Sequence, residues 1–168
     1  YIDIKNLKNI SNLINKIKPD FIFHLAAQSL VFKSYIQTVD TYETNIIGTL
    51  NILESLRYLK TKCVTIIITS DKAYQNNEWP FGYRENDILG GNDPYSSSKA
   101  ATEMVISGYL KSFFLEQNKI RIGIARAGNV IGGGDWSKDR IIPDCIKNWS
   151  KGKQLNIRNP YSIRPWQH

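Results

Sequence analysis

Cysteine is scarce in this 168-residue sequence, which contains only Cys63 and Cys145. Neither lies in a CxxC or CxxH pattern, and the two histidines, His24 and His168, are far apart along the chain. A disulfide framework or a structural zinc site requires closely spaced ligands of these types. We therefore expect two reduced thiols in a core, no bound metal, and a cytoplasmic protein.

Long apolar runs are also lacking, because no stretch approaches the ~20 residues that a membrane-spanning helix needs. Blocks of five or more basic residues are absent too, although the net charge is +7. The 22 lysines and arginines are instead spread along the chain. A basic protein can bind a nucleic acid or a small anion such as a nucleotide. The dispersed charge favours a third interpretation, in which a composition rich in lysine and asparagine simply gives a basic pI. We expect neither a membrane nor a nucleic acid as a partner.

A third absence concerns the glycine-rich turn that opens a dinucleotide-binding fold. No GxGxxG-type turn stands before residue 20, and the three glycines at 132–134 follow a late strand without that spacing. Two alternatives stay open from the residues alone. Either the cofactor-binding half lies outside this chain, or the protein binds no dinucleotide.

The sequence does contain alternating helix and strand patterns. Apolar residues at helical spacing predict four helices, at 6–17, 39–59, 94–115 and 140–149, the last interrupted by Pro143. Continuous apolar runs predict three strands buried on both faces, at 20–27, 63–70 and 120–127. We further expect a long loop at 71–92 and a short strand at 155–159.

This order predicts an α/β fold, a three-layer doubly wound parallel sheet of the Rossmann type. Residues 1–130 would form the domain built on this sheet. If it is a dinucleotide-binding domain, its first strand and glycine-rich turn are missing from it. Residues 131–168 would begin a smaller substrate-binding region. Ligands in such sheets bind beyond the carboxyl ends of the strands. The unusual polar stretches follow these ends, namely AAQS (26–29), TSDKAY (69–74) and RAGNVIGGGD (126–135).

Tyr95 and Lys99 are the first candidate catalytic pair, because i and i+4 residues share one face of a helix. A cation one turn away favours the phenolate form of a tyrosine, which could then take a proton from a sugar hydroxyl. Asp93 and Pro94 would start this helix as N-cap and first residue. The alternative is a solvent-exposed tyrosine and lysine at ordinary helical spacing.

A second cluster lies at the end of the predicted strand 63–70, where Ser70, Asp71 and Lys72 are consecutive. A hydroxyl, an acid and an amine together could remove water from two neighbouring carbons. The alternative is an ordinary polar exit from the strand.

Weaker candidates are Asn45, unfavourable within a helix, Asn129 in the glycine-rich loop, and Arg158 and Arg164 as pyrophosphate ligands. For Asn45 the alternative is a solvent-facing residue. For the others it is a flexible loop or a surface tail.

Taken in order, these stretches closely resemble the extended short-chain dehydrogenase/reductase family of nucleotide-sugar enzymes. The motifs that carry the resemblance are FHLAAQ, TNIIGTLNILE, TSDKAY, DPYSSSK, ARAGNVIGGGDW and RPWQH. Within the family, SDK in place of TDE, together with NNEWPFGYREND, NVIGGGDW and IRNPYSIRPWQH, resembles the 4,6-dehydratases that act on CDP-glucose. The similarity runs from residue 3 to 168.

The resemblance implies NAD-dependent conversion of CDP-D-glucose to CDP-4-dehydro-6-deoxy-D-glucose and water. Tyr95 would take the proton of the sugar 4-hydroxyl, with Lys99 tuning it and Ser70 bonding to the 4-oxygen. Asp71 would protonate the departing 6-hydroxyl. Lys72 stands where the family has a glutamate that removes the C5 proton, and a lysine acts as a base only in its neutral form.

The resemblance also implies binding residues. Around NAD these are Asp3, Ile4, Ala26, Ala27, Gln28, Asn45, Tyr95 and Lys99. Around the nucleotide-sugar they are Asn129, Arg140 and Arg164. Family members begin with a glycine-rich turn upstream and continue beyond RPWQH, so we expect the middle of a longer enzyme that forms a homodimer. Alternative functions are an epimerase or dehydratase acting on a GDP-, dTDP- or UDP-sugar, a catalytically inert chain, or a protein that only senses or scaffolds.

Overall fold

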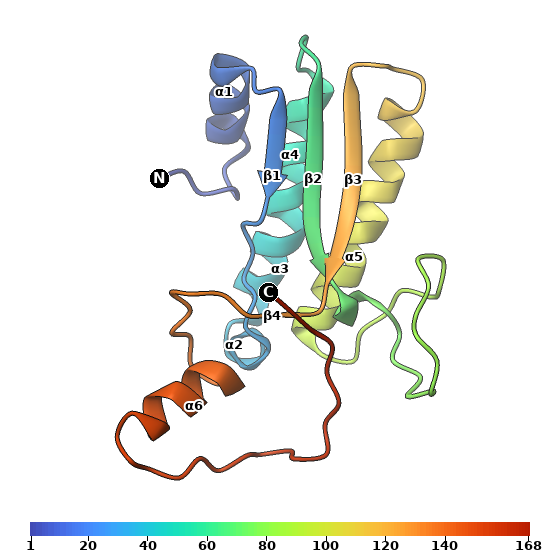
Figure 1. Ribbon diagram of the computed structural model, residues 1–168. Coiled ribbons are helices and arrows are strands. Elements are labelled where there is room, and N and C mark those ends of the chain that lie inside the picture. The colour runs from blue at the N-terminus through green and yellow to red at the C-terminus, as the bar shows by residue number, and fades with distance from the viewer. The chain divides into compact units, whose positions relative to one another are not determined.

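The computed structural model describes residues 1 to 168, which form two compact units, Tyr1–Ala127 and Gly128–His168 (Figure 1). The boundary falls inside the RAGN stretch, three residues before the boundary expected from the sequence. None of the helices has the length and apolar character that crossing a membrane would require. Both thiols, Cys63 and Cys145, are buried and free.

A three-stranded parallel sheet forms the centre of the first unit and confirms the predicted fold class. Its order is β1-β2-β3, with β1 at Phe21–His24, β2 at Cys63–Ser70 and β3 at Ile120–Ala127. The central strand β2 pairs along its whole length with β3, from Cys63 opposite Ile120 to Ser70 opposite Ala127. The carboxyl ends of β2 and β3 therefore lie side by side.

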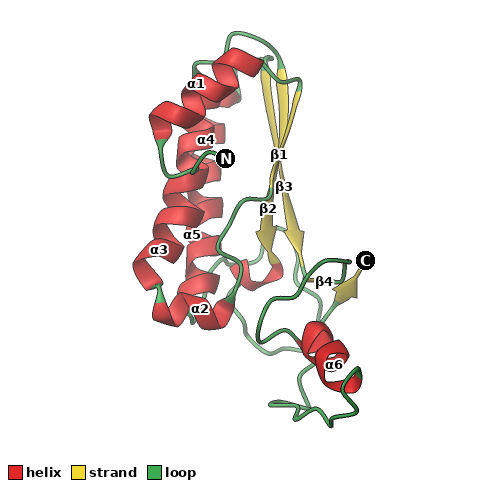
Figure 2. Ribbon diagram, turned by 90° about the vertical axis from the view of Figure 1, so that its left-hand side faces the viewer, coloured by secondary structure: helices red, strands yellow, loops and turns green.

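The helices of this unit gather on one face of the sheet (Figure 2). They are α1 (Leu7–Ile17), α2 (Val31–Ile36), α3 (Thr38–Tyr42), α4 (Gly48–Arg57) and α5 (Pro94–Tyr109). Parallel crossovers are right-handed, and two crossovers that step in the same direction place their helices on the same face. The connections β1 to β2 and β2 to β3 both step in one direction. Helices on the opposite face would require crossovers in the other direction, which these three strands do not contain.

The one-sided covering corrects the prediction that the strands at 20–27, 63–70 and 120–127 are buried on both faces. Val64 of β2 is 38% exposed and Ile124 of β3 is 36% exposed. Phe21, Phe23 and Leu25 are each about two-thirds exposed, whereas His24 points to the helical side and is 6% exposed. The alternation of exposed and buried residues follows from the two-residue period of a strand.

The predicted helix 39–59 consists of three consecutive helical segments. After α3, the chain forms a π-helical turn η1 at Glu43–Ile47 and then continues as α4. The short helix α2 was not predicted. Gly48 opens α4 at a point where a Cβ atom would lie 2.4 Å from the end of the Ile4 side chain, so a larger residue here would require that side chain to move.

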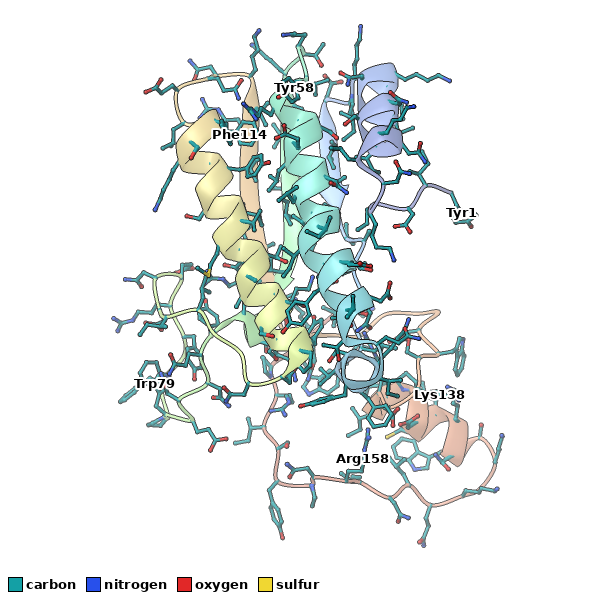
Figure 3. The ribbon with its side chains drawn as sticks, turned by 180° about the vertical axis from the view of Figure 1, so that it is seen from behind. Tyr1, Tyr58, Trp79, Phe114, Lys138 and Arg158 are labelled. Atoms are coloured by element: carbon teal, nitrogen blue, oxygen red, sulfur yellow. The ribbon has the colours of Figure 1, made fainter.

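The core of the first unit lies between the sheet and the helices. Its fully buried apolar side chains come from α4, β2, α5 and β3, namely Leu53, Leu56, Ile67, Ile106 and Ile120. The chain after α5 adds a second π-helical turn, η3 (Leu110–Phe114), whose Phe114 packs into the same core (Figure 3).

The long loop between β2 and α5 begins with a 3₁₀ turn η2 at Asp71–Ala73. An isolated antiparallel bridge pairs Tyr74 with Leu89, so the loop closes on itself near its base. Trp79 lies at the outer part of this loop (Figure 3), where its ring contacts Tyr83. The predicted loop 71–92 is confirmed and has a structured base.

The second unit contains helix α6 (Ile141–Trp149) and a small parallel pair, β4 (Asn129–Val130) with β5 (Trp166–Gln167). Pro143 does not interrupt α6, because it lies in the first turn, where a backbone N–H has no partner inside the helix. The predicted strand 155–159 is wrong, since these residues form no strand. β4 pairs instead with β5, which lies further along the chain.

His24 connects the sheet to the helical layer. Its Nε2 lies 3.0 Å from the Thr49 hydroxyl, which donates to the Asn45 carbonyl at 2.7 Å. The hydroxyl proton is thereby used, so His24 donates through its Nε2. Burial, with a smaller contribution from the charge of Lys99, lowers the pKa of His24 to about 4.

We predict that His24 makes the protein less stable in mild acid. The unfolded chain takes up a proton near pH 6.5, whereas the folded chain does so only near pH 4. The stabilisation is therefore complete above pH 6.5 and is lost as the pH falls toward 4, by roughly 3 kcal/mol in total. Denaturant titrations of the full-length protein at several pH values measure this loss.

The matched variants are His24→Gln, whose amide can still donate to Thr49, and His168→Gln, which alters an exposed histidine. The wild-type protein and His168→Gln should lose more stability than His24→Gln between pH 6.5 and 5. Parallel pH curves for all three proteins would contradict the prediction.

Candidate active site

Helix α5 carries the tyrosine–lysine pair. Asp93 caps its N-terminus, where one carboxylate oxygen accepts from the Ser96 backbone N–H at 3.0 Å, and Pro94 is the first helical residue. Tyr95 is 8% exposed and Lys99 is 5% exposed. A solvent-exposed pair on a surface helix is therefore excluded. The α5 helix instead buries both side chains.

Lys99 reaches the carboxyl end of the central strand. Its Nζ donates to the carbonyl oxygen of Ile68 at 3.3 Å. Burial lowers the pKa of Lys99 to about 8, and the negative charge of Glu103 opposes this shift. The ammonium is thus charged at neutral pH and becomes neutral at a pH well below that of an exposed lysine.

Ser70, Asp71 and Lys72 lie at the same end of β2, two to four residues beyond the carbonyl that Lys99 contacts. The Ser70 hydroxyl donates to Asp71 Oδ1 at 3.1 Å and accepts from the Lys72 backbone N–H at 3.3 Å. Ser70 is buried, while Asp71 and Lys72 are half-buried. The η2 turn packs against α5, so the two predicted clusters belong to one region.

Asn45 corrects the interpretation of a solvent-facing residue, because it is 2% exposed. Its side chain accepts from the Gln28 backbone N–H at 2.8 Å, and donates to the Gln28 carbonyl at 3.1 Å and to the Ser98 hydroxyl at 2.9 Å. Its own carbonyl accepts from Thr102 at 3.0 Å. Asn45 therefore ties the segment after β1 to α5, on the helix that carries Tyr95 and Lys99. It does so from a π-helical turn, a feature frequent at functional sites.

The segment after β1 contains the predicted cofactor residues Ala26, Ala27 and Gln28. The Gln28 amide donates to Thr41 at 3.0 Å and accepts from the Leu30 backbone N–H at 2.8 Å, so its side chain is fixed. Ala26 is exposed and Ala27 is half-buried. Two methyl side chains at the carboxyl end of a strand leave the backbone accessible to a ligand.

Asp3 and Ile4 lie in the segment before α1. The Ile4 carbonyl accepts from the Asn51 amide at 2.9 Å, which holds this segment against α4. Asp3 is exposed, and its carboxylate accepts from the Lys5 backbone N–H at 2.9 Å. The structure therefore fixes the backbone of this segment and leaves the carboxylate of Asp3 at the surface.

The candidate residues Asn129, Arg140 and Arg164 belong to the second unit. Asn129 pairs with Trp166 between β4 and β5, close to Arg164 in the chain. Arg140 forms an ion pair with Asp135 at 3.1 Å, and Arg164 is exposed. Arg158, the other predicted pyrophosphate ligand, is labelled in Figure 3. It pairs with Asp139 at 3.0 Å. Strand pairing brings Asn129 near Arg164, whereas Arg140 lies at the start of α6.

Sequence reasoning missed a buried ion pair between Glu103 and Arg126, whose Nη2 lies 2.5 Å from the carboxylate. Glu103 is 2% exposed and follows Lys99 by one helical turn. The only hint in the sequence was that Glu103 lies four residues after the candidate catalytic Lys99. A glutamate at this spacing looks like an ordinary solvated charge until its partner Arg126, 23 residues away, is known.

The residues at the carboxyl ends of β1 and β2 fit a dinucleotide cofactor. They offer accessible backbone at Ala26 and Ala27, the buried Lys99 ammonium, and the Tyr95 phenol on the same face of α5. A cation and small side chains suit a bound nicotinamide ribose, in the place where ligands bind to parallel sheets.

The comparison with known proteins agrees with this geometry. The family model described as GDP-mannose 4,6 dehydratase matches residues 1–168. CDP-glucose 4,6-dehydratase of Salmonella typhimurium is 49% identical over 99% of this chain and 47% of its own length. The dTDP-glucose 4,6-dehydratase of Haemophilus influenzae is 29% identical over 98% of the chain and 50% of its own length. The chain thus spans about half the length of these curated relatives.

Solved structures show the same fold. A dTDP-glucose 4,6-dehydratase from Streptomyces venezuelae, determined with NAD and TYD bound, superposes with a TM-score of 0.85 at 23% identity, covering 98% of this chain and 48% of its own. The UDP-glucose 4-epimerase of Thermotoga maritima also gives a TM-score of 0.85, at 24% identity. The predicted Rossmann-like fold and the resemblance to nucleotide-sugar enzymes are confirmed. The match along all 168 residues shows that the chain belongs to the GDP-mannose 4,6-dehydratase family.

Proposed function

We propose that the full-length protein carrying this chain is an NAD-dependent hydro-lyase. It converts CDP-D-glucose to CDP-4-dehydro-6-deoxy-D-glucose and water. The observation that carries the proposal is the placement of two reactive sets at one strand end. The buried Tyr95–Lys99 pair can oxidise a sugar carbon with NAD, and the Ser70–Asp71–Lys72 segment can remove water from its neighbours.

The choice of CDP-glucose rests on the relative similarities. The chain is 49% identical to a CDP-glucose enzyme, against 32% and 29% for two enzymes that act on dTDP-glucose. SDK in place of TDE at residues 70–72 is consistent with this choice. An epimerase needs no acid and base to remove the oxygen from C6, so Asp71 and Lys72 favour dehydration over epimerisation.

Oxidation at C4 uses the pair on α5. Tyr95 takes the proton of the 4-hydroxyl, Lys99 favours the tyrosinate through its charge, and Ser70 donates to the 4-oxygen. NAD, when bound, accepts hydride from C4 and returns it to C6 at the end of the reaction. Ala26, Ala27, Gln28 and Asn45 would line the cofactor's central part or hold its surroundings. Asp3 and Ile4 would border its adenine.

Elimination follows because the new ketone makes the C5 proton acidic. Asp71 in its protonated form gives a proton to the departing 6-hydroxyl, which leaves as water, and Lys72 in its neutral form takes the proton from C5. The proton returns to C5 when C6 is reduced. The proton removed from O4 and the proton given to O6 balance over the full cycle, so the net products are the keto sugar and water.

We assign the nucleotide-sugar phosphates and base to Asn129, Arg140 and Arg164 of the second unit. Arginine forks suit bidentate recognition of a pyrophosphate.

We further propose that the full-length protein is a cytoplasmic homodimer. Analytical ultracentrifugation of the full-length protein measures its oligomeric state directly.

We predict that the full-length protein with NAD converts CDP-glucose to a product lighter by one water, detectable by mass spectrometry. Tyr95→Phe should lower kcat by about 100-fold or more, because it removes the proton acceptor at O4. Tyr109→Phe is the matched control, since it removes a phenol on the same helix that bonds only to Glu54. Inversion at C4 without loss of water would indicate an epimerase. Dehydration of dTDP-glucose but not CDP-glucose would refute the assigned substrate.

A second prediction tests the base at C5. Lys72→Met should lower kcat by about 100-fold, because no group then takes the C5 proton. Lys72→Glu should retain most of the activity, since a carboxylate can serve as the same base. The measurement is exchange of the C5 proton with deuterated solvent, together with steady-state turnover. Full activity in Lys72→Met would assign the base role to another residue.

A further inference from the structure

The Ser70–Lys72 segment is held on both sides by residues bound to one buried ion pair. On the side before the segment, the Thr69 hydroxyl donates to Glu103 Oε1 at 2.7 Å. On the side after it, the ring of Tyr74 lies 4.5 Å from the guanidinium of Arg126. Glu103 and Arg126 contact each other directly, so the two flanks share a single anchor.

The ion pair has the geometry of a rigid connection. Arg126 Nε donates to both carboxylate oxygens of Glu103, at 2.9 and 3.0 Å, and Nη2 donates to Oε2. Fork-like pairing of this kind fixes orientation as well as distance. Glu103 is 2% exposed and the Arg126 side chain is 17% exposed, so water competes little for either group.

Arg126 extends the connection into the long loop. Its Nη1 donates to the Glu85 carbonyl at 3.0 Å, while its face covers Tyr74. Tyr74 stacks in turn on Tyr83, with ring centroids 4.9 Å apart. The base of the loop is closed by two backbone bonds of 2.9 Å, from Gln75 to Ile88 and from Gly90 to Ala73. Arg126 therefore binds the loop at two points beyond η2.

We propose that Glu103 and Arg126 are positioning residues for the elimination step. They hold Ser70, Asp71 and Lys72 at a fixed distance from the α5 helix, and neither touches the sugar. This inference rests on the proposed function. It predicts that removing the ion pair slows water loss more than oxidation at C4. When the pair is removed, oxidation keeps Tyr95 and Lys99 on α5 and loses only the positioning of Ser70 and the Glu103 charge beside Lys99. Elimination loses the positioning of both Asp71 and Lys72.

Displacement of a catalytic group by about 1 Å can cost about 100-fold in rate. Loosening the segment should therefore slow water loss more than oxidation at C4. A purely structural ion pair would affect both steps alike, or only the stability of the protein. The ratio of the two steps is the quantity that separates these explanations.

The decisive variant is the double substitution Glu103→Gln/Arg126→Met in the full-length protein. Removing one partner alone leaves a buried charge unpaired and destabilises the fold, whereas removing both is much less costly. Arg126→Lys is the milder single variant, because it keeps both charges of the pair, including the Glu103 charge beside Lys99, and loses only the fork. Arg57→Met is the matched control, since Arg57 also pairs with a carboxylate, Glu54, and covers aromatic rings.

Two measurements separate the explanations, one under single turnover with NAD and CDP-glucose and one without substrate. The first is the absorbance of reduced nicotinamide, which accumulates when oxidation outruns water loss. The second, made without substrate, is hydrogen exchange of the amides of Gln75 and Gly90. We expect the double variant to accumulate reduced nicotinamide, to turn over about 10- to 100-fold more slowly, and to exchange both amides faster. Arg126→Lys should show the same pattern more weakly, and Arg57→Met should behave like the wild type.

The inference is overturned if the double variant shows wild-type turnover, or if oxidation and water loss slow by the same factor. Its failure differs from failure of the proposed function. If wild-type protein forms no dehydrated product from CDP-glucose, the proposed function is wrong. If the wild type forms it and the double variant shows no change in the ratio of steps, only the role of Glu103 and Arg126 is wrong.

Discussion

The candidate active site depends on the hydrogen bond that the buried ammonium of Lys99 donates to the Ile68 carbonyl. A lysine in a core loses much of its hydration, which explains why its pKa falls to about 8. The protein offers it the Ile68 carbonyl at the end of β2 and the charge of Glu103 one turn away. A cation held at a strand end in this way is placed to act on a phenol and an anionic ligand, and α5 supplies the phenol.

The arrangement around Lys99 explains other features of the first unit. Asn45 holds α5 to the segment after β1, and His24 remains neutral next to the lysine charge. Glu103 contacts Thr69 and Arg126, and so connects α5 to both sides of Ser70–Lys72. Polar side chains from β1, β2, β3 and α5 therefore meet on one side of the sheet, and each has a hydrogen-bonding partner there.

Local signals explain how much of the fold could be predicted from the sequence. The apolar runs placed β2 and β3 at the residues where they occur, and the Asp93–Pro94 pair placed the start of α5. The small strand pair was missed because β4 finds its partner more than 30 residues later in the chain. Which face of β1 the helices of this chain cover depends on the direction of the crossovers, which no local pattern encodes.

In the candidate site, too, the residues with a local sequence signal could be predicted, whereas those that depend on distant partners could not. Tyr95, Lys99, Ser70, Asp71 and Lys72 were found from spacing and from the family resemblance, and their catalytic roles stay predictions. The burial of Asn45 required partners 17 and 53 residues away, at Gln28 and Ser98. Glu103 and Arg126 look like solvated charges in the sequence, because only the packing of α5 against β3 brings them together.

The most direct test of the account uses CDP-glucose deuterated at C4 with the full-length protein and NAD. If the Tyr95–Lys99 pair and the Ser70–Lys72 segment act on one bound sugar, the deuterium leaves C4 and returns to C6 of the same molecule. Mass and NMR analysis should then find the label at C6 of a product that has lost one water. Label that stays at C4, or that is lost from the sugar, would contradict the account.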